Sequence, residues 1–256
     1  MAKKGVILVM SCNQERFINE EIIIKKTWGK AILEGKYPNL SIYFYRGGEE
    51  LIYNEDEHLL LINCNDDLSN TFIKTQKALK WVENNIIDFD YIIRVNTSTY
   101  INIKAILSFL EMDNIDDEML YGNSLLINNS NKSIPFLRGQ FLIMPKKIVS
   151  VLVQDENIKK GVDDVAISVV LFSKYGNKYL KEHCREIDAI VDLTVPYFEQ
   201  LSKAYFVRVK DENNCENNIV RMIGLHLIYE TLVKDVNINP PHKFTKIETM
   251  NGMIPI

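Results

Sequence analysis

Apolar residues in the first hundred positions fall into short runs that alternate with segments of helical period. The run GVILVMS at 5–11 is continuously apolar, which is typical of a parallel strand buried on both faces. Similar runs predict further strands at 40–48, 58–64 and 90–95. Between them, apolar residues at helical spacing predict helices over 15–34 and about 70–85. The alternation predicts an α/β fold with a mostly parallel, Rossmann-like sheet flanked by helices.

The second half of the chain is less regular and predicts a mixed arrangement. The strand-like segments are 119–127, 136–144 and 204–210, and the helical ones are 103–111, 146–153, 163–175 and 217–233. No Gly/Ser/Pro-rich linker or internal repeat separates these segments, so we expect one domain over residues 1–256. The proline-containing tail, 237–256, is expected to lie on the surface without regular structure.

The composition of the chain disfavours some classes of binding partner. The chain is 46% hydrophobic with a formal net charge of −4, which disfavours nucleic acid as a partner because nucleic-acid binders carry a basic face. No apolar run is long enough for a transmembrane segment or a signal peptide. The widely spaced cysteines indicate free thiols in a reducing compartment, and we therefore expect a cytoplasmic protein. The dinucleotide-binding, P-loop and α/β-hydrolase motifs are absent.

Polar residues follow the predicted strand 90–95, at a point where open α/β sheets bind ligands. They are Asn96, Thr97 and Ser98. Mg²⁺ and Mn²⁺ prefer carboxylates, so Asn96 and Ser98 would hold a metal only weakly. The alternative interpretation is a polar turn that closes the strand.

Two adjacent acids, Asp163 and Asp164, follow Gly161 at the start of a predicted helix. Acids at this position cap a helix and interact favourably with its dipole. The functional alternative is that one carboxylate caps the helix while the other faces a cleft and acts as a general base, within hydrogen-bond reach of a hydroxyl.

Two further clusters carry charge. Arg208 and Lys210 lie two apart on a predicted strand, so they share a face and could hold a diphosphate without a metal. Ordinary solvated strand charges are the alternative. Asp66 and Asp67 precede a helix that contains Lys74, which is compatible with helix capping beside a surface lysine.

Five segments match the motif blocks of one enzyme family in order and approximate spacing. They are KKTWGK (25–30), DDLSNTFIKTQKALKWV (66–82), YIIRVNTSTYIN (91–102), FLRGQFLIMPKKIVSVLV (136–153) and VDDVAIS (162–168). Together they resemble the inverting galactosyltransferase/fringe-like glycosyltransferases, which have a GT-A fold. The chain departs from the family where its acidic triplet is replaced by Asn96–Ser98, at Ser168 in place of a glycine, and in the lysines before T-W-G, where Arg16 lies further upstream.

The resemblance implies an enzyme of polysaccharide biosynthesis that moves a sugar from a nucleotide-sugar donor, UDP-sugar by family default, to a glycan acceptor. Residues 1–100 would form the nucleotide-binding half and residues 101–236 the acceptor-side half. Asp164 would be the catalytic base, with Asp163 as its acidic neighbour. The implied nucleotide-sugar positions are Ser11, Asn13, Arg16, Asp66, Lys74, Asn96 and Ser98, and the acceptor-side positions are Arg138 and Gly139.

Because the acidic triplet is missing, the sequence does not decide whether the enzyme uses a divalent metal ion or no cofactor. Without a metal, Arg208 and Lys210 would supply the positive charge that a leaving diphosphate needs. Two alternatives remain: a degenerate GT-A domain that binds glycan or nucleotide without catalysis, and a nucleotidyltransferase, which would need carboxylates for Mg²⁺ at the strand end.

Overall fold

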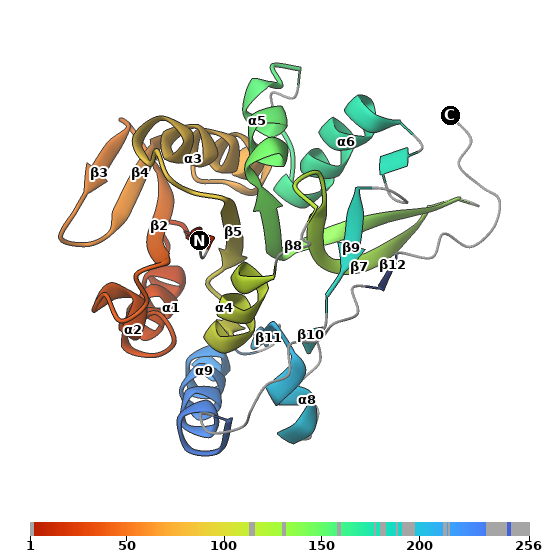
Figure 1. Cartoon of the computed structure of the whole chain (residues 1–256). Coiled ribbons are helices and arrows are strands. Elements are labelled where there is room, and N and C mark those ends of the chain that lie inside the picture. The colour runs from red at the N-terminus through yellow and green to blue at the C-terminus, as the bar shows by residue number, and fades with distance from the viewer. Residues whose placement is uncertain are drawn as a thin grey trace.

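The computed structural model describes residues 3–112, 116–129, 132–157, 160–176, 178–179, 183–187, 189–190, 198–211, 214, 216–233 and 245–246. Across these residues one sheet of nine strands runs in the order β12-β9-β7-β8-β5-β1-β2-β4-β3 (Figure 1). Its strands are β1 (Gly5–Met10), β2 (Leu40–Gly48), β3 (Ile52–Asn54), β4 (Leu59–Asn63), β5 (Tyr91–Asn96), β7 (Leu120–Asn129), β8 (Lys132–Pro145), β9 (Cys184–Glu186) and β12 (Thr245–Lys246).

The sheet has a parallel half and a mixed half. β1 pairs in parallel with β2 and β5, and β2 pairs in parallel with β4. β8 then runs antiparallel to both β5 and β7, while β9 is parallel to β7. The predicted fold class, a GT-A-like Rossmann-type sheet with a mixed second half, is confirmed. The expectation of a single domain stays a prediction.

Helices cover both faces of the sheet (Figure 1). They are α1 (Glu15–Lys26), α2 (Lys30–Leu33), α3 (Thr71–Asn85), α4 (Ile103–Glu111), α5 (Lys146–Gln154), α6 (Asp163–Tyr175), α8 (Phe198–Lys203) and α9 (Glu216–Ile228), with a 3₁₀ turn, η1 (Leu68–Asn70), and a π-helical turn, η2 (Tyr229–Val233). In the part of the chain that the structure describes, no helix has the length and apolar character to cross a membrane.

Successive side chains of a strand point to opposite faces of the sheet, and this alternation gives one hydrophobic core on each face. Ile7 and Val9 of β1 face a core that includes residues of α1, α4 and α9. Val6 and Leu8 face the opposite core, with residues of α3, α5 and α6. On the neighbouring strand β5, Ile92 also belongs to this second core. Side chains alternate along a strand, so those of Arg94 and Asn96 point to the same face as Ile92. This is the face that carries α3 and α6.

Several predicted elements are corrected. The helix predicted over 15–34 is broken between α1 and α2, because the backbone leaves helical geometry at Thr27, with φ −115° and ψ −121°. Gly29 follows, where a Cβ would lie 2.9 Å from the Ile24 carbonyl oxygen. Trp28 then donates from Nε1 to the Thr99 carbonyl at 3.1 Å. The tail expected to be irregular contributes β12, which pairs with β9. The other residues of 237–256 lie outside the described residues.

A second, small sheet was not expected from the sequence. It has the order β10-β11-β6 and consists of β10 (Ala189–Ile190), β11 (Phe206–Arg208) and β6 (Thr99–Ile101). The strand predicted over 204–210 is therefore shorter than expected. β11 runs antiparallel to β6, which follows the polar turn after β5. This pairing brings the end of β11 beside the end of β5.

Candidate functional site

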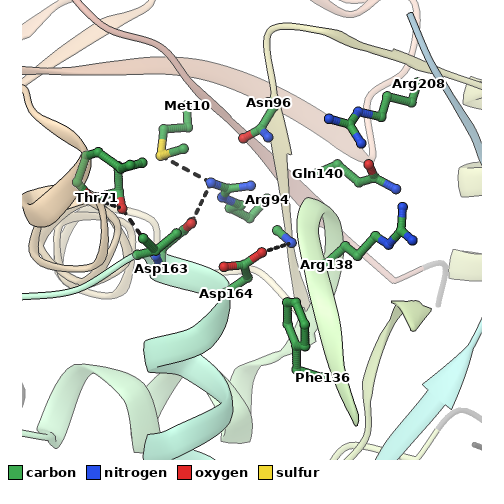
Figure 2. A pocket seen from close by; sticks show the side chains of 13 residues that line it. Met10, Thr71, Arg94, Asn96, Phe136, Arg138, Gln140, Asp163, Asp164 and Arg208 are labelled. Atoms are coloured by element: carbon green, nitrogen blue, oxygen red, sulfur yellow. Dashed lines mark hydrogen bonds and ion pairs between the residues drawn. The ribbon is translucent and has the colours of Figure 1, made fainter. Parts of the chain in front are cut away.

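A pocket of about 340 Å³ opens where β1 and β5 end (Figure 2). This is the carboxyl edge of the parallel strands, where the sequence predicted a site. The pocket is lined by Met10, Leu68, Thr71, Arg94, Asn96, Phe136, Arg138, Gly139, Gln140, Val162, Asp163, Asp164 and Arg208. Six of the predicted site residues therefore meet in it: Asn96, Arg138, Gly139, Asp163, Asp164 and Arg208.

A bulge in β8 supplies one wall of the pocket. Gly122 of β7 is opposite Leu142, but Ser124 is already opposite Leu137, so the β8 residues between them bulge out of register. Bulges re-aim side chains and are common beside active sites. This one presents Arg138, Gly139 and Gln140 to the pocket.

Arg94 and Asp163 form a buried ion pair at the base of the pocket. The Arg94 guanidinium has no exposed surface, and its Nη2 contacts an Asp163 oxygen and, at 3.1 Å, the Met10 Sδ. Thr75 Oγ1 donates to Asp163 Oδ2 at 3.4 Å. Burial raises the pKa of Asp163, and the Arg94 charge opposes that shift. Asp163 is thus the counterion of Arg94, which leaves it poorly placed to exchange protons with a ligand.

Asp164 faces the pocket and is held in one orientation. Its Oδ2 accepts a hydrogen bond from the Gly139 backbone N–H at 3.0 Å, and its Oδ1 accepts from Val165 N at 2.9 Å. The N-cap of α6 is Val162, so the expectation that one of the two acids caps this helix is wrong. Both acids lie in its first turn, where the helix dipole favours negative charge.

Two arginines approach the opposite wall from different strands. Arg138 comes from β8 and Arg208 from the end of β11, and the guanidinium groups of both lie near Gln140 (Figure 2). Burial lowers the pKa of Arg138, and the neighbouring Arg208 charge lowers it further. Two like charges held this close favour an anionic group between them.

The donors around the strand end do not suit a divalent cation. Among the described residues, no three His, Cys, Asp or Glu side chains gather into a group that could hold a metal ion. Asn96 lines the pocket beside Arg208, whereas Ser98 does not, and the Ser98 carbonyl accepts from Val209 N at 3.0 Å. A neutral amide next to guanidinium groups gives a cation no compensating charge.

Thr97, between these two residues, is part of the fold. It is buried, and its Oγ1 donates to Glu20 of α1, which is also buried. Asn218 Nδ2 of α9 donates to the same carboxylate at 2.7 Å. Arg16 lies 3.9 Å from it through Nε and does not line the pocket.

The remaining predicted nucleotide residues form a network beside the pocket. Lys74 Nζ pairs with Asp66 Oδ1 at 2.5 Å and donates to the Ser11 carbonyl at 2.7 Å. Asp66 Oδ2 accepts from Asn13 N at 2.7 Å. Lys74 is 2% exposed, so the expectation of a surface lysine is wrong. Neither this network nor Lys210 lines the pocket.

Sequence reasoning missed several pocket residues, notably Arg94, Gln140, Thr71 and Met10. A signal for Arg94 was present, because an arginine inside the apolar strand YIIRV is unusual unless it is paired. No local signal marks Gln140, whose role depends on the bulge in β8.

No protein-family model matches the sequence. No curated protein matches it either. Among solved structures, the chain is similar to a glycosyltransferase involved in the glycosylation of the major capsid of PBCV-1, with a TM-score of 0.50 and 11% identity over 86% of this chain and 99% of that chain. It is also similar to the inositol-1-phosphate CTP transferase from T. maritima, with a TM-score of 0.40 and 11% identity over 66% of this chain and 82% of that one. The first likeness shows a shared fold, and the second is too weak to add to it.

We predict that Gly139→Ala destabilises the protein. A Cβ at position 139 would lie 3.0 Å from the Asp164 Cβ and 3.3 Å from Arg94 Nη1. Such overpacking costs about 1–3 kcal/mol, which for a chain of this size lowers Tm by roughly 2–4 °C per kcal/mol. Calorimetry measures the shift.

The matched control is Gly224→Ala on α9, where nothing lies within 4 Å of the added Cβ. This substitution should raise stability by up to about 1 kcal/mol, since alanine favours a helix interior. Equal Tm values for Gly139→Ala and the wild type would contradict the close approach of β8 to α6.

Proposed function

We propose that this chain is an inverting glycosyltransferase that moves a sugar from a nucleotide-sugar donor, with UDP-sugar expected, to a hydroxyl of a glycan. One observation carries the proposal: Asp164, held by Gly139 N, shares a pocket with Arg138 and Arg208. The fold is shared with a glycosyltransferase, but a fold hosts many functions, so the argument rests on the site.

Direct displacement at an anomeric carbon needs a base on one side and a stabilised leaving group on the other. We assign the base to Asp164, because within the described part of the chain this pocket carboxylate forms no ion pair, whereas Asp163 is tied to Arg94. The acceptor oxygen would bond to the anomeric carbon while its proton passes to Asp164. The bond from that carbon to the diphosphate oxygen breaks, and the electron pair leaves with the diphosphate.

The leaving diphosphate would be held by Arg138 and Arg208. Guanidinium groups bind phosphate oxygens through two parallel hydrogen bonds, and in a pocket shielded from water such contacts are stronger than in solution. They would do the electrostatic work for which related folds use a metal. We therefore propose that transfer needs no divalent cation.

The second candidate is a domain that binds a nucleotide or glycan without turnover. The loss of the acidic triplet motivates it. Against it stands the retention of Asp164, oriented by two backbone N–H groups toward the pocket. A binding domain has no requirement for a carboxylate beside the sugar.

Replacing the proposed base tests the reaction. Asp164→Asn keeps an oxygen for Gly139 N but cannot take up the proton, so the rate should fall about 10²–10⁴-fold. The measurement is UDP release from UDP-sugars in the presence of mixed glycan acceptors. UDP affinity, measured by calorimetry, should stay unchanged. UDP release at nearly the wild-type rate would remove Asp164 from the role of base.

Replacing the arginines one at a time tests the diphosphate site. Arg138→Ala and Arg208→Ala should each weaken UDP binding roughly tenfold to a hundredfold. This is the change in affinity that corresponds to losing a hydrogen bond to a charged group, which contributes about 1.5–3 kcal/mol. Lys210→Ala is the matched control, because Lys210 carries the same charge close by but does not line the pocket. If all three variants bind UDP equally well, the diphosphate lies elsewhere.

A further inference from the structure

Buried polar atoms without a partner gather at this pocket. Among the described residues, seven buried side-chain nitrogen or oxygen atoms make no hydrogen bond, and five of them belong to pocket residues: Arg94 Nε, Arg94 Nη1, Asn96 Oδ1, Arg138 Nε and Gln140 Nε2. Folded proteins pair nearly all such atoms, since an unpaired one costs free energy. Their concentration in one place indicates a surface that a ligand completes.

Three of these residues form the inner wall, which we define as Arg94, Asn96 and Gln140. All three lie near the junction of β5 and β8 and line the pocket, and Figure 2 shows Arg94 on the side of Met10 and Gln140 on the side of Arg208. Arg94 has no exposed surface, and Gln140 is 5% exposed. The inner wall therefore presents unpaired hydrogen-bond donors and one unpaired acceptor. Because the side chains of Arg94 and Gln140 are buried, they have little room to turn toward partners within the protein.

The charge of the inner wall is already balanced. Burial alone would lower the pKa of Arg94, but Asp163 and Tyr45 raise it above its ordinary value. Arg94 is thus a cation whose charge is matched by Asp163, while its Nε and Nη1 remain open as donors. A second anion placed against Arg94 Nε and Nη1 would also approach both Asp163 and Asp164, whereas Arg138 and Arg208 lie on the Gln140 side of the pocket (Figure 2), so an uncharged acceptor is favoured beside Arg94.

From this balance we infer that the inner wall selects the donor sugar and that it takes an uncharged, hydroxylated ring rather than a uronic acid. The inference rests on the proposed function and adds the substrate class. Sugar hydroxyls can accept from Arg94 and Gln140 and donate to Asn96, which fits the unpaired atoms. Gly139, which lacks a Cβ, lets the backbone of β8 approach Arg94 Nη1 and Asp164 closely. Arg94 and Asp164 line the same pocket, so a ring bound against the inner wall would share it with the proposed base.

The variant Arg94→Lys tests this role, because a lysine keeps a positive charge for Asp163 but loses the open guanidinium donors. The ligands are UDP, UDP-glucose, UDP-galactose, UDP-N-acetylglucosamine and UDP-glucuronate, measured by calorimetry with EDTA present. In the wild type, at least one neutral sugar nucleotide should bind tighter than both UDP and UDP-glucuronate. In Arg94→Lys that affinity should fall roughly tenfold to a hundredfold, while UDP binding changes less than twofold.

Different failures point to different conclusions. Preferred binding of UDP-glucuronate, or an equal loss for UDP and its sugars in Arg94→Lys, would overturn the sugar assignment and leave the diphosphate site standing. No binding of UDP to the wild type would overturn the proposed function, and this inference with it.

Gln140→Leu separates sugar recognition from folding. Removing a buried amide nitrogen that lacks a partner should leave Tm unchanged or higher, since its burial costs free energy in the unliganded protein. The affinity for the preferred sugar nucleotide should nevertheless fall about tenfold. A lower Tm with unchanged sugar affinity would make Gln140 a structural residue and contradict its place in the inner wall.

Discussion

The arrangement of the site depends on the buried ion pair between Arg94 and Asp163. A guanidinium without exposed surface requires a counterion, and removing one partner of such a pair leaves an uncompensated charge in the interior. The pair fixes the first turn of α6 against β5. Asp164, the next residue, is thereby held against the bulge of β8, where Gly139 N donates to it. One interaction in the core thus sets the geometry of the carboxylate that faces the pocket.

The positive charge of the pocket comes from three arginines on three different strands. Asn96 lies at the end of β5, and Arg94, Arg138 and Arg208 line the same pocket. Arg138 and Arg208 arrive from the bulge of β8 and from β11, which are elements of the second half of the chain. Arg138 thus comes from the mixed half of the large sheet and Arg208 from the small sheet, whereas the parallel half supplies Asn96 and the paired cation Arg94.

The sequence predicted the features that depend on residues close to one another in the chain. Continuous apolar runs predicted β1, β2, β4 and β5, and the strand-end rule pointed to Asn96. Contacts between residues far apart in the chain could not be predicted in this way. Arg94 finds its counterion at Asp163, far along the chain, and Lys74 is buried only because Asp66 and the Ser11 carbonyl receive its ammonium. Two- and three-residue strands such as β6, β10 and β12 are too short to show a period. The bulge that presents Gln140 depends on the pairing of β7 with β8.

The most direct test of the account is the thermal stability of the protein with UDP, GDP, CMP and dTDP, each in EDTA and in Mn²⁺. A ligand at about 100 times its Kd adds roughly 2.7 kcal/mol, which for a chain of this size raises Tm by several degrees, at about 2–4 °C per kcal/mol. The account predicts a rise with UDP of the same size in EDTA and in Mn²⁺. A rise that requires Mn²⁺ would contradict the arginine site, and no rise with any of the nucleotides would contradict nucleotide binding altogether.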